Sequence, residues 1–161
     1  MLPRIFLSLA LIAVPSLFAQ ATEPTAHTTA DLQQREAKLT ETAKASPTGF
    51  AVAPLDDYGN DYTLLVVRLH TGDAERHQFF ADQIVISKGT ITLVTGGTMQ
   101  GEHLNSGPGR PGETLGSSIQ GGKEVVLHAG DIVHIPAGIS HWVKVAPGTT
   151  VTYLVFKEKD K

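Results

Sequence analysis

The sequence of 161 residues contains no cysteine. This absence excludes disulfide bonds, thiolate metal sites, iron–sulfur clusters and thiol catalysis. Any metal ion that the protein binds must therefore be held by histidine, aspartate, glutamate or water.

The chain also carries little net charge. It has 16 acidic and 13 basic residues, a formal net charge of −3, and no run of lysine or arginine. It therefore lacks the basic surface that attracts nucleic acid or anionic lipid, and we expect a small molecule, not a polyanion, as its partner. With 41% hydrophobic residues it is too apolar for a disordered chain, and its length predicts one compact domain.

The apolar run near the start of the chain is too short to cross a bilayer. It extends from Ile5 to Phe18 and is interrupted by Pro15, whereas a membrane-spanning helix needs roughly 20 residues. Arg4 precedes the run, and the small residues of the stretch 19–21 follow it, as at a signal-peptidase site. We predict that residues 1–21 are a signal peptide, that the protein is exported to the periplasm or secreted, and that no stable membrane anchor remains after cleavage.

Residues 22–49 are predicted to form an N-terminal helical segment. The stretch 28–44 is rich in Ala, Gln, Glu, Lys and Leu, and Thr28 stands three residues before Asp31 as a helix cap. Its apolar stripe is narrow, with Leu32 and Leu39 seven residues apart. We therefore expect this helix to pack on the outside of a larger structure.

The remainder, residues 50–161, is predicted to be a β-domain. Short runs rich in Val, Ile, Leu, Thr and Tyr alternate with glycine, proline and aspartate, which is typical of a small sandwich or barrel. The predicted strands are 50–53, 62–69, 75–79, 82–87, 90–94, 124–128, 132–135, 141–145 and 149–157. Residues 96–122 interrupt this pattern with nine glycines. We favour a flexible surface excursion there over a structured lid, and the loop's length suggests a role in substrate specificity.

A strand, a tight turn and a second strand are predicted around Pro136 and Gly138. The second strand begins at His141, which shares a face with Val143 and Val145. An imidazole at the head of an apolar row beside a tight turn suits a metal ligand.

A second polar cluster precedes it in the chain. Glu75 and His77 are two residues apart and point the same way in a strand, and Asp82 heads the apolar row of Ile84 and Ile86. A buried carboxylate is costly unless a cation or a donor compensates it. Two imidazoles and two carboxylates would suit a divalent Fe, Mn, Zn, Ni or Co ion.

These two segments resemble the motifs of the cupins, which are small β-barrel proteins. Gly130, Pro136, Gly138 and His141 match the second cupin motif, with valine at position 145 in place of asparagine. In the first motif His77 and Gly89 keep the expected spacing, whereas glutamate at position 75 replaces a histidine and aspartate at position 82 replaces a glutamate. The resemblance covers roughly residues 62–157 and is closest to small, single-domain, exported bacterial cupins of the type-2 conserved-barrel kind.

This resemblance implies a mainly β fold, with a single jelly-roll-like cupin barrel and an N-terminal helix. It also implies that the protein forms a homodimer. It also implies a divalent metal held by Glu75, His77, Asp82 and His141, with Glu75 as a further candidate for a catalytic base. The function implied is binding of a metal in the barrel and action on a small organic molecule, as a dioxygenase, isomerase or lyase. The alternatives are a cupin that binds a small molecule without turnover and a structural barrel with a vestigial site.

The sequence is also compatible with simpler roles for the same residues. Each histidine on its own is explained by hydrogen bonding near the barrel mouth. Asp82 is also explained as a turn cap, and Glu75 as a partner of Arg68 or Arg76 in solvent. The joint spacing of the four residues favours a metal site over these roles.

Overall fold

A computed structural model describes residues 23–105 and 111–160. The predicted signal peptide, residues 1–21, lies outside these residues. Within them, no helix has both the length and the apolar character needed to cross a membrane.

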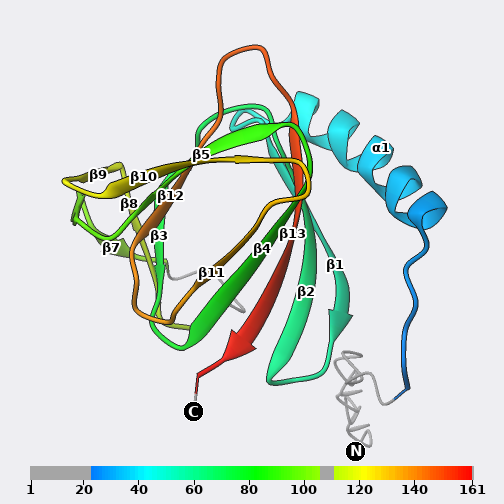
Figure 1. Cartoon of the computed structure of the whole chain (residues 1–161), viewed down its shortest axis with the longest axis horizontal. Helices are drawn as coiled ribbons and strands as arrows, with labels where there is room; N and C mark the ends of the chain where they lie inside the picture. Colours follow the sequence, from blue (N-terminus) through cyan, green and yellow to red (C-terminus); the bar gives the residue numbers. More distant parts are fainter. Residues whose placement is uncertain (1–22, 106–110, 161) are drawn as a thin grey trace, which may run out of the picture.

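The one helix of the described residues, α1 (Thr29–Ala45), lies where the composition predicts it. The side chain of Thr28 caps its N-terminus by accepting a hydrogen bond from the backbone N–H of Asp31. Its two buried residues, Leu39 and Ala43, pack on the outer face of a sheet, and Figure 1 shows the helix outside β1 and β2. The helix therefore covers the barrel and contributes nothing to its interior.

The sheet beneath the helix has five antiparallel strands in the order β1-β2-β13-β4-β11. In that order the strands are β1 (Phe50–Asp57), β2 (Asp61–Arg68), β13 (Val151–Lys159), β4 (Phe80–Lys88) and β11 (Ile132–Ile135). The C-terminal strand β13 lies at the centre of this sheet, between two strands from the first half of the domain. The sheet thus joins segments that are far apart in the sequence.

The opposing sheet has six antiparallel strands in the order β10-β5-β12-β3-β8-β7. Their bounds are β10 (Lys123–His128), β5 (Thr90–Thr95), β12 (His141–Lys144), β3 (Ala74–His77), β8 (Glu113–Gly116) and β7 (His103–Leu104). The two sheets enclose the main apolar core, to which Ile86, Leu93, Val151 and Tyr153 belong. The predicted mainly β, jelly-roll-like fold with one N-terminal helix is confirmed.

The glycine-rich stretch 96–122 differs from the prediction of a flexible excursion. Outside residues 106–110, which are not described, it contains β6 (Thr98–Gln100) and β9 (Ser118–Gln120), which pair with one another, and also β7 and β8. Strand β8 pairs along the whole of β3. The physical reason is that glycines permit tight turns between very short strands, and the turn glycines 97, 101, 112 and 121 all have positive φ. The described part of the stretch is therefore structured, and its strands β8 and β7 extend the six-stranded sheet beyond β3.

Candidate metal centre

A cavity of about 330 Å³ lies between the two sheets. Its walls are largely apolar, with side chains such as Val66, Ile84 and Val155 from the five-stranded sheet. All of the side chains that the sequence analysis singled out line this same cavity: Glu75, His77, Asp82 and His141. The fold thus brings together residues from β3, β4 and β12.

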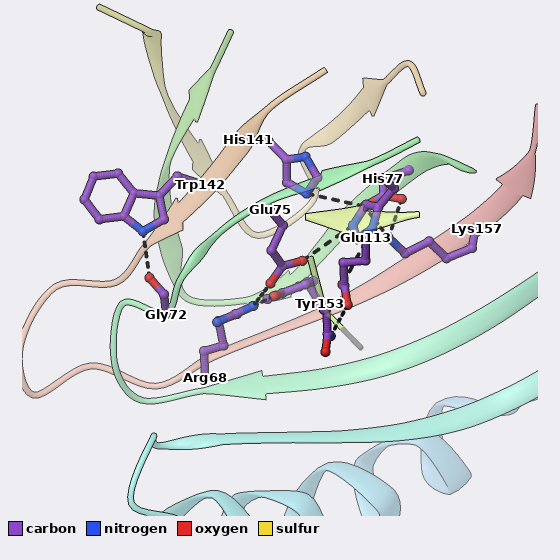
Figure 2. A network of polar contacts seen from close by, with 11 residues as sticks. Arg68, Gly72, Glu75, His77, Glu113, His141, Trp142, Tyr153 and Lys157 are labelled. Carbon is purple, nitrogen blue, oxygen red and sulfur yellow. Dashed lines mark hydrogen bonds and ion pairs between the residues drawn. The ribbon is translucent and has the colours of Figure 1, made fainter. Parts of the chain in front are cut away.

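Strand pairing places three of these side chains in position to share an ion. Glu75 and His77 alternate with Arg76 along β3, and His141 of β12 is the cross-strand neighbour of Glu75. One ligand atom from each of Glu75, His77 and His141 lies within 4.8 Å of the other two. Figure 2 shows the two imidazoles and the Glu75 carboxylate turned toward one another. Two histidines and one carboxylate form a donor set that suits a divalent transition metal.

His141 is held as a neutral imidazole with one nitrogen facing the site. Its Nδ1 lies 3.2 Å from the backbone carbonyl of Ile139. Because a carbonyl only accepts hydrogen bonds, Nδ1 carries the proton in this contact and Nε2 presents its lone pair. Burial lowers the pKa of His141, which outweighs the opposing effect of the carboxylates of Glu75 and Asp82. The residue therefore has the tautomer and the charge state that a metal ligand requires.

His77 lies among carboxylates. Its Nε2 is 3.4 Å from Asp82 Oδ2 and 3.5 Å from Glu75 Oε2, and its Nδ1 is 3.6 Å from Glu113 Oε1. Burial by itself would lower the pKa of His77, but the carboxylates of Asp82 and Glu75 outweigh it and raise the pKa to about 9. Nε2 is buried and makes no hydrogen bond to any residue that the structure describes. This nitrogen therefore has an unfilled bonding position directed at its carboxylate neighbours.

Glu75 is fixed by a buried arginine. Arg68 Nη2 donates a 2.9 Å hydrogen bond to Glu75 Oε1, and Arg68 Nε donates a 2.7 Å bond to the hydroxyl of Tyr153 (Figure 2). The guanidinium also lies over the ring of Phe50, with its carbon 4.6 Å from the ring centroid. Burial raises the pKa of Glu75, but His77 and Arg68 outweigh it and hold the pKa well below its usual range. The carboxylate is therefore anionic, which suits a metal ligand better than a base that must take up a proton.

The partner of Glu75 corrects one alternative from the sequence. Pairing with Arg68 occurs, but Arg68 is only 7% exposed, so the pair lies inside the cavity and not in solvent. Arg76 points elsewhere and binds Glu102.

Asp82 makes a buried ion pair with Lys157. The two are cross-strand neighbours in β4 and β13, and Lys157 Nζ lies 2.6 Å from Oδ1 and 2.7 Å from Oδ2 of Asp82, with good hydrogen-bond geometry only to Oδ2. Burial raises the pKa of Asp82, but His77 and Lys157 outweigh it, and the pKa is lowered. Asp82 therefore already has a cation as its partner, and its role as a metal ligand stays a prediction.

Sequence reasoning missed the role of Lys157 and the buried position of Arg68. Both follow the alternation of their strands, because Lys157 continues the inward row of Tyr153 and Val155, and Arg68 continues the row that includes Val66. The signal in the sequence was a basic residue at the end of a row of inward-facing apolar residues. It indicates a charged partner inside the barrel.

Trp142 and His134 lie away from this centre. Trp142 alternates with His141 and Val143 along β12 and faces away from the cavity; it packs beside Ala74 and Met99 and donates a hydrogen bond to the Gly72 carbonyl. His134 is exposed.

Comparison with known proteins finds similarity only in structure. No family model and no curated protein sequence matches the chain significantly. A recombinant oxalate oxidase, solved in complex with glycolate, matches with a TM-score of 0.50 and 19% identity over 71% of this chain and 53% of the oxidase. The chain thus spans about half the length of that relative. The protein TT1209 from Thermus thermophilus matches with a TM-score of 0.51 and 16% identity over 71% of this chain and 87% of its own.

These identities are too low to transfer an activity, and they show the fold alone. The oxalate oxidase is a cupin-fold protein, and the structural match to it covers 71% of this chain. This agrees with the two motifs found in the sequence. The chain has the cupin fold.

Proposed function

We propose that this protein binds a divalent transition metal in its barrel through Glu75, His77 and His141 and uses it to bind and transform a small organic molecule. The observation that carries this proposal is the buried Nε2 of His77. It lacks a hydrogen bond within the described residues, yet lies within a few ångströms of Glu75 and His141. Its contacts with the carboxylates of Glu75 and Asp82, at 3.5 and 3.4 Å, lack hydrogen-bond geometry, and a bound metal would give this nitrogen a short bond.

The residues present fit such an ion. His141 is neutral and turned by Ile139, and Glu75 is anionic and held by Arg68. Metal–ligand bonds of about 2.0–2.2 Å require these atoms to draw together from their 4.8 Å spread, which small side-chain movements achieve. Because His77 must lose its proton to bind, metal and proton compete for this residue.

The cavity defines the class of substrate. Its volume of about 330 Å³ and its apolar walls suit a small organic molecule. The oxalate oxidase that shares the fold was solved with glycolate, a small hydroxy acid. This supports a small oxygen-bearing ligand here as well.

A bound metal would polarise an oxygen of such a ligand and, if it is redox-active, allow dioxygen chemistry. The chain's own residues orient and shield the ligand. Arg68 keeps the Glu75 carboxylate anionic, and apolar residues of β2, β4 and β13 exclude water. Turnover by a dioxygenase, isomerase or lyase route is our first proposal, and ligand binding without turnover is the second.

We also propose that the protein is exported, that its mature chain begins near residue 22 and comprises a helical segment to residue 49 and a cupin barrel from residue 50, and that it forms a homodimer. The support for export is the signal-like sequence of residues 1–21. Fractionation with N-terminal sequencing of the mature protein, followed by light scattering, tests these statements.

Metal analysis tests the site. Untagged mature protein should contain about one equivalent of metal by mass spectrometry, and His77→Ala and His141→Ala should each lose it. His134→Ala is the matched control, because that histidine is exposed and should leave the metal content unchanged. Wild-type protein that stays free of metal after supplementation with Fe, Mn, Zn, Ni and Co would refute the site.

Turnover is then tested on the metal-loaded protein. Oxygen uptake and product analysis over a panel of small hydroxy acids, catechols, β-diketones and thiols separates an enzyme from a binding protein. Uptake that disappears in His77→Ala supports an oxygenase or oxidase. Tight binding of a panel member without any product favours the binding role.

A further inference from the structure

Lys157 places a fixed positive charge directly beside the candidate metal centre. Its side chain is buried, and its ammonium contacts both carboxylate oxygens of Asp82. Because the two residues are cross-strand neighbours in β4 and β13, the register of the sheet holds them together. Breaking such a buried pair is costly, so it is a fixed part of the site.

Asp82 would otherwise be within reach of the metal. Its Oδ2 lies 3.4 Å from His77 Nε2 and 3.5 Å from His141 Nε2. By distance alone, this oxygen could serve as a fourth ligand. The same oxygen, however, accepts a 2.7 Å hydrogen bond from Lys157.

An ammonium and a divalent metal compete for this oxygen. Both are cations, they repel one another at short range, and the ammonium has no lone pair to offer the metal. Within the part of the chain that the structure describes, Lys157 has no other acidic partner, so moving it away from Asp82 would leave a buried, unpaired charge.

We propose that Lys157 is a positioning residue that withholds Asp82 from the metal, so that the metal-binding face consists of Glu75, His77 and His141 alone. This inference rests on the proposed function. A three-residue face leaves one more coordination position for oxygen atoms of a small molecule than a four-residue face does. Lys157 thus leaves one more position on the metal open to oxygen atoms of a small molecule or of water.

Metal affinity tests this without any measurement of activity. Titration calorimetry with Co²⁺ compares the full mature protein with Lys157→Met, Lys157→Met/Asp82→Asn and Lys144→Met. Lys144 is the matched control, since it is a half-exposed lysine paired with Glu124, and its loss changes the net charge equally. We expect Lys157→Met to bind Co²⁺ roughly 10- to 100-fold more tightly, the range found for changes beside metal ligands. The double variant, which lacks the released carboxylate, should return to the wild-type affinity, and Lys144→Met should not differ from it.

The outcomes separate the inference from the proposed function. Equal affinity in wild type and Lys157→Met overturns the inference alone. A gain that persists in the double variant also overturns it, because Asp82 would then not be the added ligand. No Co²⁺ binding by the wild type overturns the proposed function and, with it, this inference, even if Lys157→Met binds the ion. If the methionine variant does not fold, Lys157→Gln, whose amide still donates to Asp82 without a charge, replaces it with the same expected direction.

Discussion

A single glycine makes room for the arginine that fixes Glu75. A Cβ atom at Gly72 would lie 2.1 Å from Arg68 Nη1, closer than any real contact. Gly72 is not among the glycines with positive φ, so its role is space and not backbone conformation. Its backbone carbonyl also accepts the hydrogen bond from Trp142.

We expect Gly72→Ala to displace Arg68 from Glu75 and to lower the free energy of unfolding by about 1–3 kcal/mol, the cost of leaving a buried charged group without its partner. Chemical denaturation measures this loss. Arg68→Met serves as the background control, because in it the added methyl group has no guanidinium to displace. If the losses in free energy of unfolding caused by Gly72→Ala and Arg68→Met simply add in the double variant, the clash with Arg68 is not the cause.

At the level of residues, the sequence predicts which groups approach the cavity and leaves open how they pair. Alternation within one strand places Glu75 beside His77 and sets Asp82 at the head of an inward row. How these groups pair depends on the register between β4 and β13. Asp82 and Lys157, which pair across these two strands, are 75 residues apart in the sequence. No local pattern encodes that register, so the ion pair emerges only from the folded sheet.

Among the elements, helix α1 stabilises the barrel from outside. Leu39 and Ala43 bury their side chains against Ala51, Leu65 and Val67 on the face of the sheet opposite the cavity. The helix makes most of its contacts with β1 and β2, and Glu36 also forms an ion pair with Lys88 of β4.

Leu39→Ala should therefore destabilise the fold without affecting the metal centre. Loss of a buried leucine side chain costs about 2–5 kcal/mol, so we expect a lower Tm by calorimetry and unchanged metal content. Leu32→Ala is the milder control, since Leu32 lies on the same helix but is less buried. A loss of metal from folded Leu39→Ala protein would contradict this separation of helix and site.

The elements most accurately predicted are those with strong periodicity. The cap at Thr28 and the two strands around Pro136 follow from local chemistry. The prediction for the stretch 96–122 is wrong because strands of two to four residues have too few positions for a pattern to appear. Their pairing with β3 and with each other is a tertiary effect.

For the whole molecule, the raised pKa of His77 links folding to pH in the metal-free protein. The pKa rises from 6.5 to about 9 on folding, so the folded state binds this proton more tightly than the unfolded chain does. The resulting stabilisation is fully present below about pH 6.5 and is lost as the pH rises through about 9.

We therefore expect the free energy of unfolding of the metal-free protein to fall by on the order of 3 kcal/mol as the pH rises from about 6.5 to above about 9. Urea titrations across the window measure it. His77→Gln removes the titrating group and should flatten the dependence. An equally steep dependence in His77→Gln would assign it to other groups.

The position of the metal is the most direct test of the proposed site. Crystals of the Co²⁺- or Zn²⁺-loaded protein, measured at the absorption edge of the metal, give an anomalous difference map that locates the ion. We predict one strong peak bounded by His77 Nε2, His141 Nε2 and the Glu75 carboxylate, with Lys157 still bound to Asp82. A map without a peak between these three side chains, or with its peak elsewhere in the barrel, would contradict the proposal.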